Sequence, residues 1–171
     1  DIFFSLSGIL VLFPLLIFFG SLIWLQDFKS PLYISKRIGK DKKIFKILKL
    51  RTMVHEADRS GVESTSLDDK RITLIGRVIR KYKIDEITQL WNVLKGNMSF
   101  VGPRPNTQSG VSLYTEVEKE LWSVRPGITD FASIVFSDEG EILKGSTDPD
   151  LTYNKLIRPG KSYLGLFYIN K

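Results

Sequence analysis

The sequence has 171 residues, of which 43% are hydrophobic and 26% charged, a composition that is typical of a globular protein and excludes a disordered or fibrous chain. It contains 25 Lys and Arg against 19 Asp and Glu, which gives a net charge of +6. Because cysteine is absent and His55 is the only histidine, disulfides, thiolate metal sites, Cys nucleophiles and His-rich metal centres are excluded.

A long apolar segment begins the sequence. The 24 residues of Ile2–Leu25 carry no charge. As a helix they extend roughly 36 Å, against about 30 Å for the core of a bilayer. The next stretch, Lys29–Arg51, holds nine basic residues and one acid, and such a flank binds anionic headgroups and indicates the cytoplasmic side. We therefore expect a membrane anchor over residues 1–27 and a cytosolic-face domain over residues 28–171.

Pro14 lies in the middle of the apolar segment and removes one helical hydrogen bond. One interpretation is a kinked helix that crosses the membrane once, since spanning helices tolerate proline. The other is a re-entrant hairpin whose halves, Ile2–Phe13 and Leu15–Leu25, enter the membrane and return to the same face. The residues alone leave both alternatives open.

The next elements follow from hydrophobic periodicity. Leu32–Ile38 and Ile44–Leu50 alternate apolar and basic residues around a turn and predict a β-hairpin. We expect a short helix over Val54–Arg59 and a polar loop over Ser60–Lys70. Ile72–Lys81 has helical spacing with basic flanks, so it is either an amphipathic helix on a membrane surface or a solvated helix on a core.

A helix is most strongly predicted over Asp85–Lys95, with Asp85 as N-cap or first-turn residue and Gly96 as the stop. Two prolines and a glycine predict a rigid extended loop over Phe100–Asn106. We expect a second helix over Ser112–Ser123, a turn over Arg125–Thr129 and a strand over Phe131–Phe136. The tail after them is expected to mix loop with helix near Leu151–Ile157.

Asp85 and Glu86 form an adjacent acidic pair at the start of the predicted helix. Acids at a helix N-terminus are often there for stability alone. Helical spacing places four polar residues on one face of the helix: Asp85, Thr88, Gln89 and Asn92. The Glu86 side chain points about 100° away from that of Asp85 around the helix axis.

The cations around this pair are held on stiff elements rather than on long solvated helices. These are Lys49, Arg51, Arg80, Arg104 and Arg125. Such cations suit a phosphate-bearing substrate. A carboxylate nucleophile beside them suits phosphoryl transfer through an aspartyl-phosphate, with Mg²⁺ to reduce the repulsion between carboxylate and phosphate.

The run from Asp85 to Pro105, DEITQLWNVLKGNMSFVGPRP, resembles the signature of bacterial sugar transferases, the monotopic polyprenyl-phosphate phosphoglycosyl transferases. The resemblance also rests on Arg37-x-Gly39, Lys49-Leu-Arg-Thr-Met53, Asp69-x-Arg71-Ile-Thr73 and Arg125-Pro-Gly-Ile-Thr129, and it covers roughly residues 1–135. The length resembles that of minimal members, which consist of a catalytic domain and an anchor.

The resemblance implies an enzyme that moves a sugar phosphate from a UDP-sugar to undecaprenyl phosphate or a similar polyprenyl phosphate and releases UMP. It assigns Asp85 as the nucleophile and Mg²⁺ ligand and Glu86 as an assisting catalytic residue. Arg80 and Arg104 match the family's arginines near the phosphates, and Lys49 and Arg51 match its basic element; Arg125 is expected to bind phosphate with them.

The resemblance also favours the re-entrant anchor broken at Pro14. The expected fold is therefore α+β: this anchor, amphipathic surface helices and a small, mostly helical domain with a β-hairpin. The expected location is the cytoplasmic face of a bacterial inner membrane, in contact with its lipids, as the first membrane step of glycoconjugate assembly. A homodimer stays open, and neither the sugar nor the pathway follows from the sequence.

The sequence departs from the family pattern at several positions. Leu50 replaces a usual Phe, Thr88 a common Pro and Asn97 a common Asp. Asp130–Ser133 replaces a common Gly-Trp-Ala-Gln, and a family arginine shortly after it has no match in Phe136–Gly140.

Two other functions are weighed against the enzyme. A membrane-tethered basic module for nucleic acid or acidic lipid fits the net charge but leaves Asp85 and Glu86 unexplained, so we expect no nucleic-acid partner. A structural subunit of a polysaccharide assembly complex is the third alternative.

Overall fold

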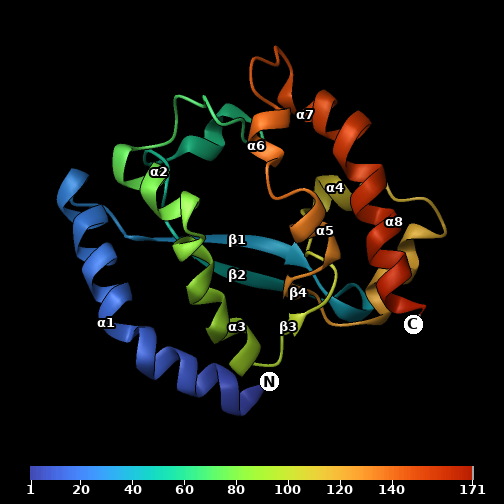
Figure 1. The fold of residues 1–171 in the computed structure, drawn as a ribbon, viewed down its shortest axis with the longest axis horizontal. Coiled ribbons are helices and arrows are strands. Elements are labelled where there is room, and N and C mark those ends of the chain that lie inside the picture. The colour runs from blue at the N-terminus through green and yellow to red at the C-terminus, as the bar shows by residue number, and fades with distance from the viewer. Residues whose placement is uncertain (171) are drawn as a thin grey trace.

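A two-stranded antiparallel hairpin lies at the centre of the computed structural model, which describes residues 1–170 (Figure 1). Its strands are β1 (Leu32–Ile38) and β2 (Ile44–Leu50), as the alternation of apolar and basic residues predicts. The 3₁₀ turn η1 (Lys40–Lys42) joins them. Together with the predominance of helix, this confirms the predicted α+β class.

The apolar segment forms one helix, α1 (Ile2–Asp27), which is long and apolar enough to cross a membrane. The helix continues through Pro14, so the expected division into two helices is absent. The helix can continue because a proline in a long helix removes a single hydrogen bond and the turns on either side keep theirs. In Figure 1 the helix bends along one side of the molecule, past α3 and α2.

Both ends of α1 are bound to the rest of the chain. Asp1 accepts a hydrogen bond from Ser99 Oγ at 2.6 Å, and Asp27 pairs with both terminal nitrogens of Arg51 at 2.6 and 2.7 Å. Ile23 is buried with residues of β2 and α2. Both ends of α1 are therefore fixed to one folded body, and the re-entrant anchor stays a prediction.

The helix predicted from Ile72 is α2 (Leu74–Lys81), which begins two residues later because Thr73 caps it and accepts from Gly76 N at 3.0 Å. One face packs on the core through Ile79, which is fully buried. The other face exposes Leu74 (79%) and Val78 (47%), as a helix on a membrane surface requires.

The helix predicted over Asp85–Lys95 consists of a 3₁₀ helix, η3 (Ile84–Gln89), followed by α3 (Leu90–Leu94). Asp85 lies in the first turn and is not the N-cap, which is Lys83 at a φ of 56°. Gly96 ends the element at a φ of 75°, as expected.

Several predictions for shorter elements are wrong. Only a 3₁₀ turn, η2 (Ala57–Ser60), forms where a helix was expected over Val54–Arg59. The predicted helix Ser112–Ser123 is divided into α4 (Gln108–Ser112) and η4 (Glu118–Ser123). Capping determines where each of these two helices begins. Thr107 caps α4. At the start of η4, the side chain of Glu118 accepts from Thr115 N and the side chain of Thr115 accepts from Glu118 N.

The apolar run predicted as a strand over Phe131–Phe136 is a helix, α5 (Phe131–Val135). Asp130 caps it by accepting from Ser133 N at 2.7 Å, and this local bond outweighs the β-propensity of the run. The expected turn before it contains a short strand, β4 (Gly127–Thr129), which pairs in parallel with β3 (Ser99–Val101).

The tail is helical over more of its length than predicted. It contains α6 (Glu139–Ile142), α7 (Pro149–Thr152), a π-helical turn η5 (Tyr153–Ile157) and α8 (Arg158–Ile169). In Figure 1, α8 returns alongside α5, and it also contacts η4. The tail therefore packs beside the loop that follows β3.

Candidate active site

The carboxylate pair is held against β2 by the polar face of its own element. Thr88 Oγ1 donates to Leu48 O at 2.9 Å. Asn92 donates to Lys46 O at 2.7 Å and accepts from Leu48 N at 3.1 Å. Thr88 and Asn92 therefore position the element rather than bind substrate. The docking fixes Asp85 and Glu86 beside the strand.

Lys49 on β2 contacts both acids. Its Nζ lies 2.7 Å from Glu86 Oε1 and 3.7 Å from Asp85 Oδ2. The three side chains are largely buried, with exposed fractions of 19% or less. Charges at these distances in a site of low water content interact strongly.

Arg104 reaches the pair from the loop between Pro103 and Pro105, both of which are buried. Its Nη2 lies 2.5 Å from Glu86 Oε1 and its Nη1 3.4 Å from Glu86 Oε2. The backbone N–H of Arg104 donates to Asp130, at the start of α5. The loop is extended and fixed, as the prolines predict.

The two acids have opposite electrostatic properties. Burial raises the pKa of Asp85 above its usual value, although Lys49 acts in the other direction. Burial acts on Glu86 as well, but Arg104 and Lys49 outweigh it and lower the pKa of Glu86 well below its usual value. Burial also lowers the pKa of Lys49.

Their hydrogen bonding differs in the same way. Both oxygens of Glu86 are engaged by cations. Within the described residues, Asp85 accepts no side-chain hydrogen bond, and Lys49 at 3.7 Å is its one ion-pair partner. A buried carboxylate with few partners is available to attack an electrophile or to bind a cation.

The structure brings Arg80 to the site but not all of the predicted cations. Arg80, in the last turn of α2, donates from Nε to Thr52 Oγ1 at 2.8 Å and interacts electrostatically with Asp85 and Glu86. Arg51 instead binds Asp27 and Ser30 O at the end of α1. Arg125 is exposed. Phosphate binding by Arg51 and Arg125 stays a prediction.

Asp85 also fits a magnesium ion. Mg²⁺ is usually bound by one or two carboxylates together with substrate phosphates and water, and needs no cage of protein ligands. The described residues contain no cluster of three or more Asp, Glu or His side chains. Asp85, with its oxygens little engaged, is the group that suits such an ion.

Sequence reasoning missed the cations that the fold adds beside Arg104. Arg37 on β1 interacts electrostatically with Arg104 and Tyr153, and burial lowers its pKa. Arg158 and Lys161 from α8 line a cavity of about 450 Å³ that Arg104 also lines. The alternation of β1 places Arg37 on one face of the hairpin, but no local pattern connects the tail to this loop.

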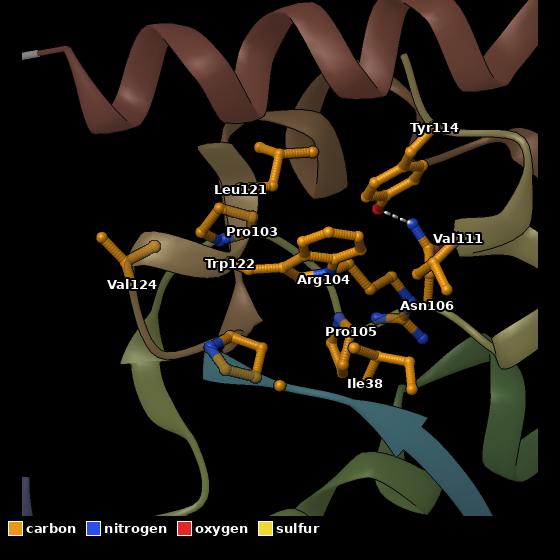
Figure 2. A pocket seen from close by; sticks show the side chains of 12 residues that line it. Ile38, Pro103, Arg104, Pro105, Asn106, Val111, Tyr114, Leu121, Trp122 and Val124 are labelled. Atoms are coloured by element: carbon orange, nitrogen blue, oxygen red, sulfur yellow. Dashed lines mark hydrogen bonds between the residues drawn. The ribbon is translucent and has the colours of Figure 1, made fainter. Parts of the chain in front are cut away.

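A second, smaller hollow of about 260 Å³ lies along the same loop. Figure 2 shows Trp122 beside the loop and the side chain of Asn106 bonded to the Tyr114 hydroxyl at 2.5 Å. The lining of this hollow is mainly apolar apart from Arg104 and Asn106.

Comparisons with known proteins show which family the chain resembles. The profile of a family described as bacterial sugar transferase matches residues 1–159. The exopolysaccharide production protein PSS of Rhizobium leguminosarum bv. phaseoli is 39% identical over 176 residues, an alignment that covers 99% of this chain and 85% of the relative.

Two further relatives are named for their reactions. A UDP-N-acetylgalactosamine-undecaprenyl-phosphate N-acetylgalactosaminephosphotransferase of Aeromonas hydrophila is 36% identical over 138 residues, covering 79% of this chain. An undecaprenyl-phosphate glucose phosphotransferase of Komagataeibacter xylinus is 39% identical over 137 residues, covering 76%. The aligned parts span only 33% and 26% of these two proteins, and 59% of a relative from Bacillus subtilis. With a family profile that matches nearly its whole length, the chain belongs to the bacterial sugar transferase family.

Proposed function

We propose that this protein transfers a sugar 1-phosphate from a UDP-sugar to undecaprenyl phosphate and releases UMP, with Asp85 as a covalent nucleophile. The observation that carries the proposal is the contrast between Asp85, which has few partners, and Glu86, which is held by Lys49 and Arg104. The names of the Aeromonas and Komagataeibacter relatives support the acceptor, and they specify different sugars.

The reaction has two displacements at one phosphorus. In the first, an Asp85 carboxylate oxygen attacks the phosphorus bonded to the sugar, the P–O bond to UMP breaks, and UMP leaves with the bonding electrons. In the second, a phosphate oxygen of the acceptor attacks the aspartyl phospho-sugar and Asp85 is released as a carboxylate. The product is a polyprenyl diphosphate sugar, and the kinetics are ping-pong.

The surrounding residues stabilise charge on the transferred group. Lys49 and Arg104 bind Glu86 beside Asp85, and Arg80 interacts electrostatically with both acids, so these three cations are the candidates to contact phosphate oxygens. Glu86 holds Lys49 and Arg104 in place and remains ionised because its pKa is lowered. It acts as a positioning residue whose charge fixes the two cations.

Mg²⁺ is proposed as the cofactor, with Asp85 as its protein ligand. When bound, the ion supplies neutralisation of phosphate charge, which lowers the repulsion between the donor and the nucleophile. Asp85 has the free oxygens for this role, while both oxygens of Glu86 are already engaged.

The proposed location is the cytoplasmic face of the inner membrane, where a lipid phosphate and a soluble nucleotide sugar can meet. The exposed apolar side chains of α1 and α2 support it. Ile84, the residue before Asp85, packs against the buried cluster that contains Ile23 of α1. Asp85 therefore directly follows a residue that packs against the same cluster as the membrane anchor.

The test is UMP release from a panel of UDP-sugars, with undecaprenyl phosphate and Mg²⁺. We expect release by the unmodified protein, loss of at least about 10³-fold in Asp85→Asn, and no loss in the exposed control Asp58→Asn. Turnover by Asp85→Asn near the unmodified rate would rule out the covalent mechanism. The best donor identifies the sugar.

A further inference from the structure

The cavity of about 450 Å³, a volume that includes space open to solvent, lies between the proline loop, the start of α5 and the C-terminal helices. Its charged lining comes from Arg104, Asp130, Arg158 and Lys161, and Tyr153 also lines it. Three cations line it, and one carboxylate.

Most of these polar groups already have fixed structural partners. Asp130 caps α5 and accepts from Arg104 N. Arg158 pairs with Glu118 at 2.9 Å, and Glu118 also accepts from Ser162 Oγ at 2.5 Å in a buried network. These contacts join η4 to α8 and are needed for packing.

Lys161 differs from Arg158, because its ion-pair partner Glu139 is partly exposed, whereas Glu118 is buried. Glu139 has 31% of its side chain exposed, against 16% for Lys161. The Lys161 ammonium also lies 5.3 Å from the centre of the Tyr153 ring, a cation–π contact that holds it in the cavity. A solvent-accessible carboxylate that pairs with a more buried lysine can be replaced by another anion.

Arg104 is shared between the cavity and the carboxylate site. The guanidinium of Arg104 binds Glu86, and the same residue lines the cavity. Both Glu139 and Tyr153 interact electrostatically with Arg104. A ligand with phosphates near Arg104 would therefore extend toward Lys161.

We propose that this cavity takes a phosphate of the donor's nucleoside diphosphate, and that Lys161 exchanges the Glu139 carboxylate for an oxygen of that phosphate. The inference rests on the proposed function and deepens it. Lys161 lies beyond the residues matched by the family profile, 1–159. Glu139 then occupies, in the free protein, the place of a substrate phosphate.

This exchange has a consequence that a purely structural salt bridge does not have. If the pair only fastened α8 to α6, removing either charge would have the same effect. With exchange, loss of the Lys161 charge weakens donor binding, whereas loss of the Glu139 charge removes a competitor for Lys161 and strengthens it. The two substitutions therefore have effects of opposite sign.

The experiment measures UDP affinity by calorimetry and donor KM by UMP release, on the purified full chain in lipid nanodiscs. The variants are Lys161→Met, which keeps the aliphatic stem, Lys161→Arg, Glu139→Gln and the exposed control Lys155→Met. Melting temperatures of all variants verify folding.

We expect Lys161→Met to weaken UDP binding and raise donor KM about tenfold, with kcat within about twofold and the KM for undecaprenyl phosphate unchanged. Lys161→Arg should recover most of the affinity, and Glu139→Gln should bind UDP about threefold more tightly. Lys155→Met should match the unmodified protein.

Unchanged UDP affinity in Lys161→Met, or equal weakening in Lys161→Met and Glu139→Gln, would overturn the inference while leaving the proposed function intact. A rise in the acceptor KM instead of the donor KM would overturn it too. Failure of the proposed function has a distinct signature, because the unmodified protein would then neither bind UDP nor release UMP from any donor.

Discussion

Two adjacent carboxylates in this protein have opposite surroundings. Glu86 is surrounded by the charges of Lys49 and Arg104, which keep it ionised, whereas Asp85 is buried with a weaker counter-charge. A nucleophile must be accessible and poorly solvated, and this condition costs folding stability. The two residues should therefore differ in how they contribute to stability and to catalysis.

The stability of Asp85→Asn tests the first half of this contrast. The folded pKa of Asp85 is raised above its ordinary 3.8, so its ionisation destabilises the fold as pH rises through that range. At pH 7 we expect the neutral variant to melt about 2–4 °C higher than the unmodified protein. The difference should vanish below pH 3.8. A lower melting temperature at pH 7 would contradict the argument.

Glu86→Gln should behave in the opposite way. Its folded pKa is lowered, so the stabilisation that it contributes is complete above the ordinary carboxyl pKa of 4.5 and is lost as pH falls below that value. We expect a lower melting temperature at pH 7 and a kcat reduced about 10²-fold, because Lys49 and Arg104 lose their common anchor. Thermal scans at pH 7 and UMP release measure both effects. Unchanged values for both would remove the positioning role of Glu86.

At the scale of elements, hydrophobic periodicity predicts the hairpin, and capping residues determine where several of the short helices begin. The bounds of β1 and β2 follow from apolar alternation, and the predicted helix over Asp85–Lys95 forms with Leu90 and Val93 buried. The run Phe131–Phe136 has an equally apolar pattern, yet Asp130 caps it as a helix. Hydrophobic pattern alone does not separate a short helix from a short strand.

The site shows the same limit. Asp85, Glu86, Lys49 and Arg104 are predicted from motif and chemistry, and the structure brings them together. Lys161 is more than fifty residues from Arg104 in the sequence and reaches the cavity only because α8 packs beside α5. Such long-range contacts depend on packing between elements and leave no local signal.

The contact between Asn92 and β2 gives a prediction at this scale. Asn92→Ala would leave Lys46 O and Leu48 N without their partner and would cost about 2–4 kcal/mol of unfolding free energy. The Asn92→Ala substitution should also lower kcat. The helix η3, which carries Asp85, continues directly into α3, so the contact between Asn92 and β2 also holds Asp85 beside Lys49. Denaturant unfolding and UMP release measure the two effects, with Asn97→Ala as the control. Equal stability of the two variants would contradict this account of how the site is positioned.

At the scale of the whole molecule, the anchor and the catalytic residues form one packed unit. Asp1 binds Ser99, Asp27 binds Arg51, and Ile23 packs with β2 and α2 between these ends. The exposed apolar face of α1 therefore lies beside the residues that hold the carboxylate pair. Under the proposed function, this arrangement keeps the active site close to the headgroups, where the phosphate of a lipid acceptor is found.

Because the sequence lacks cysteine, single cysteines can report on which side of the membrane each end of α1 lies. Asp1→Cys and Lys29→Cys mark the two ends, and Lys155→Cys marks the domain as a reference. A re-entrant anchor predicts that an impermeant maleimide labels all three in inverted inner-membrane vesicles and none of them in spheroplasts. Labelling of Asp1→Cys from the outside, with Lys29→Cys labelled from the inside, would instead show a single crossing. In that case the bond between Asp1 and Ser99 could not exist in the membrane, and α1 would have to separate from the domain along its first half.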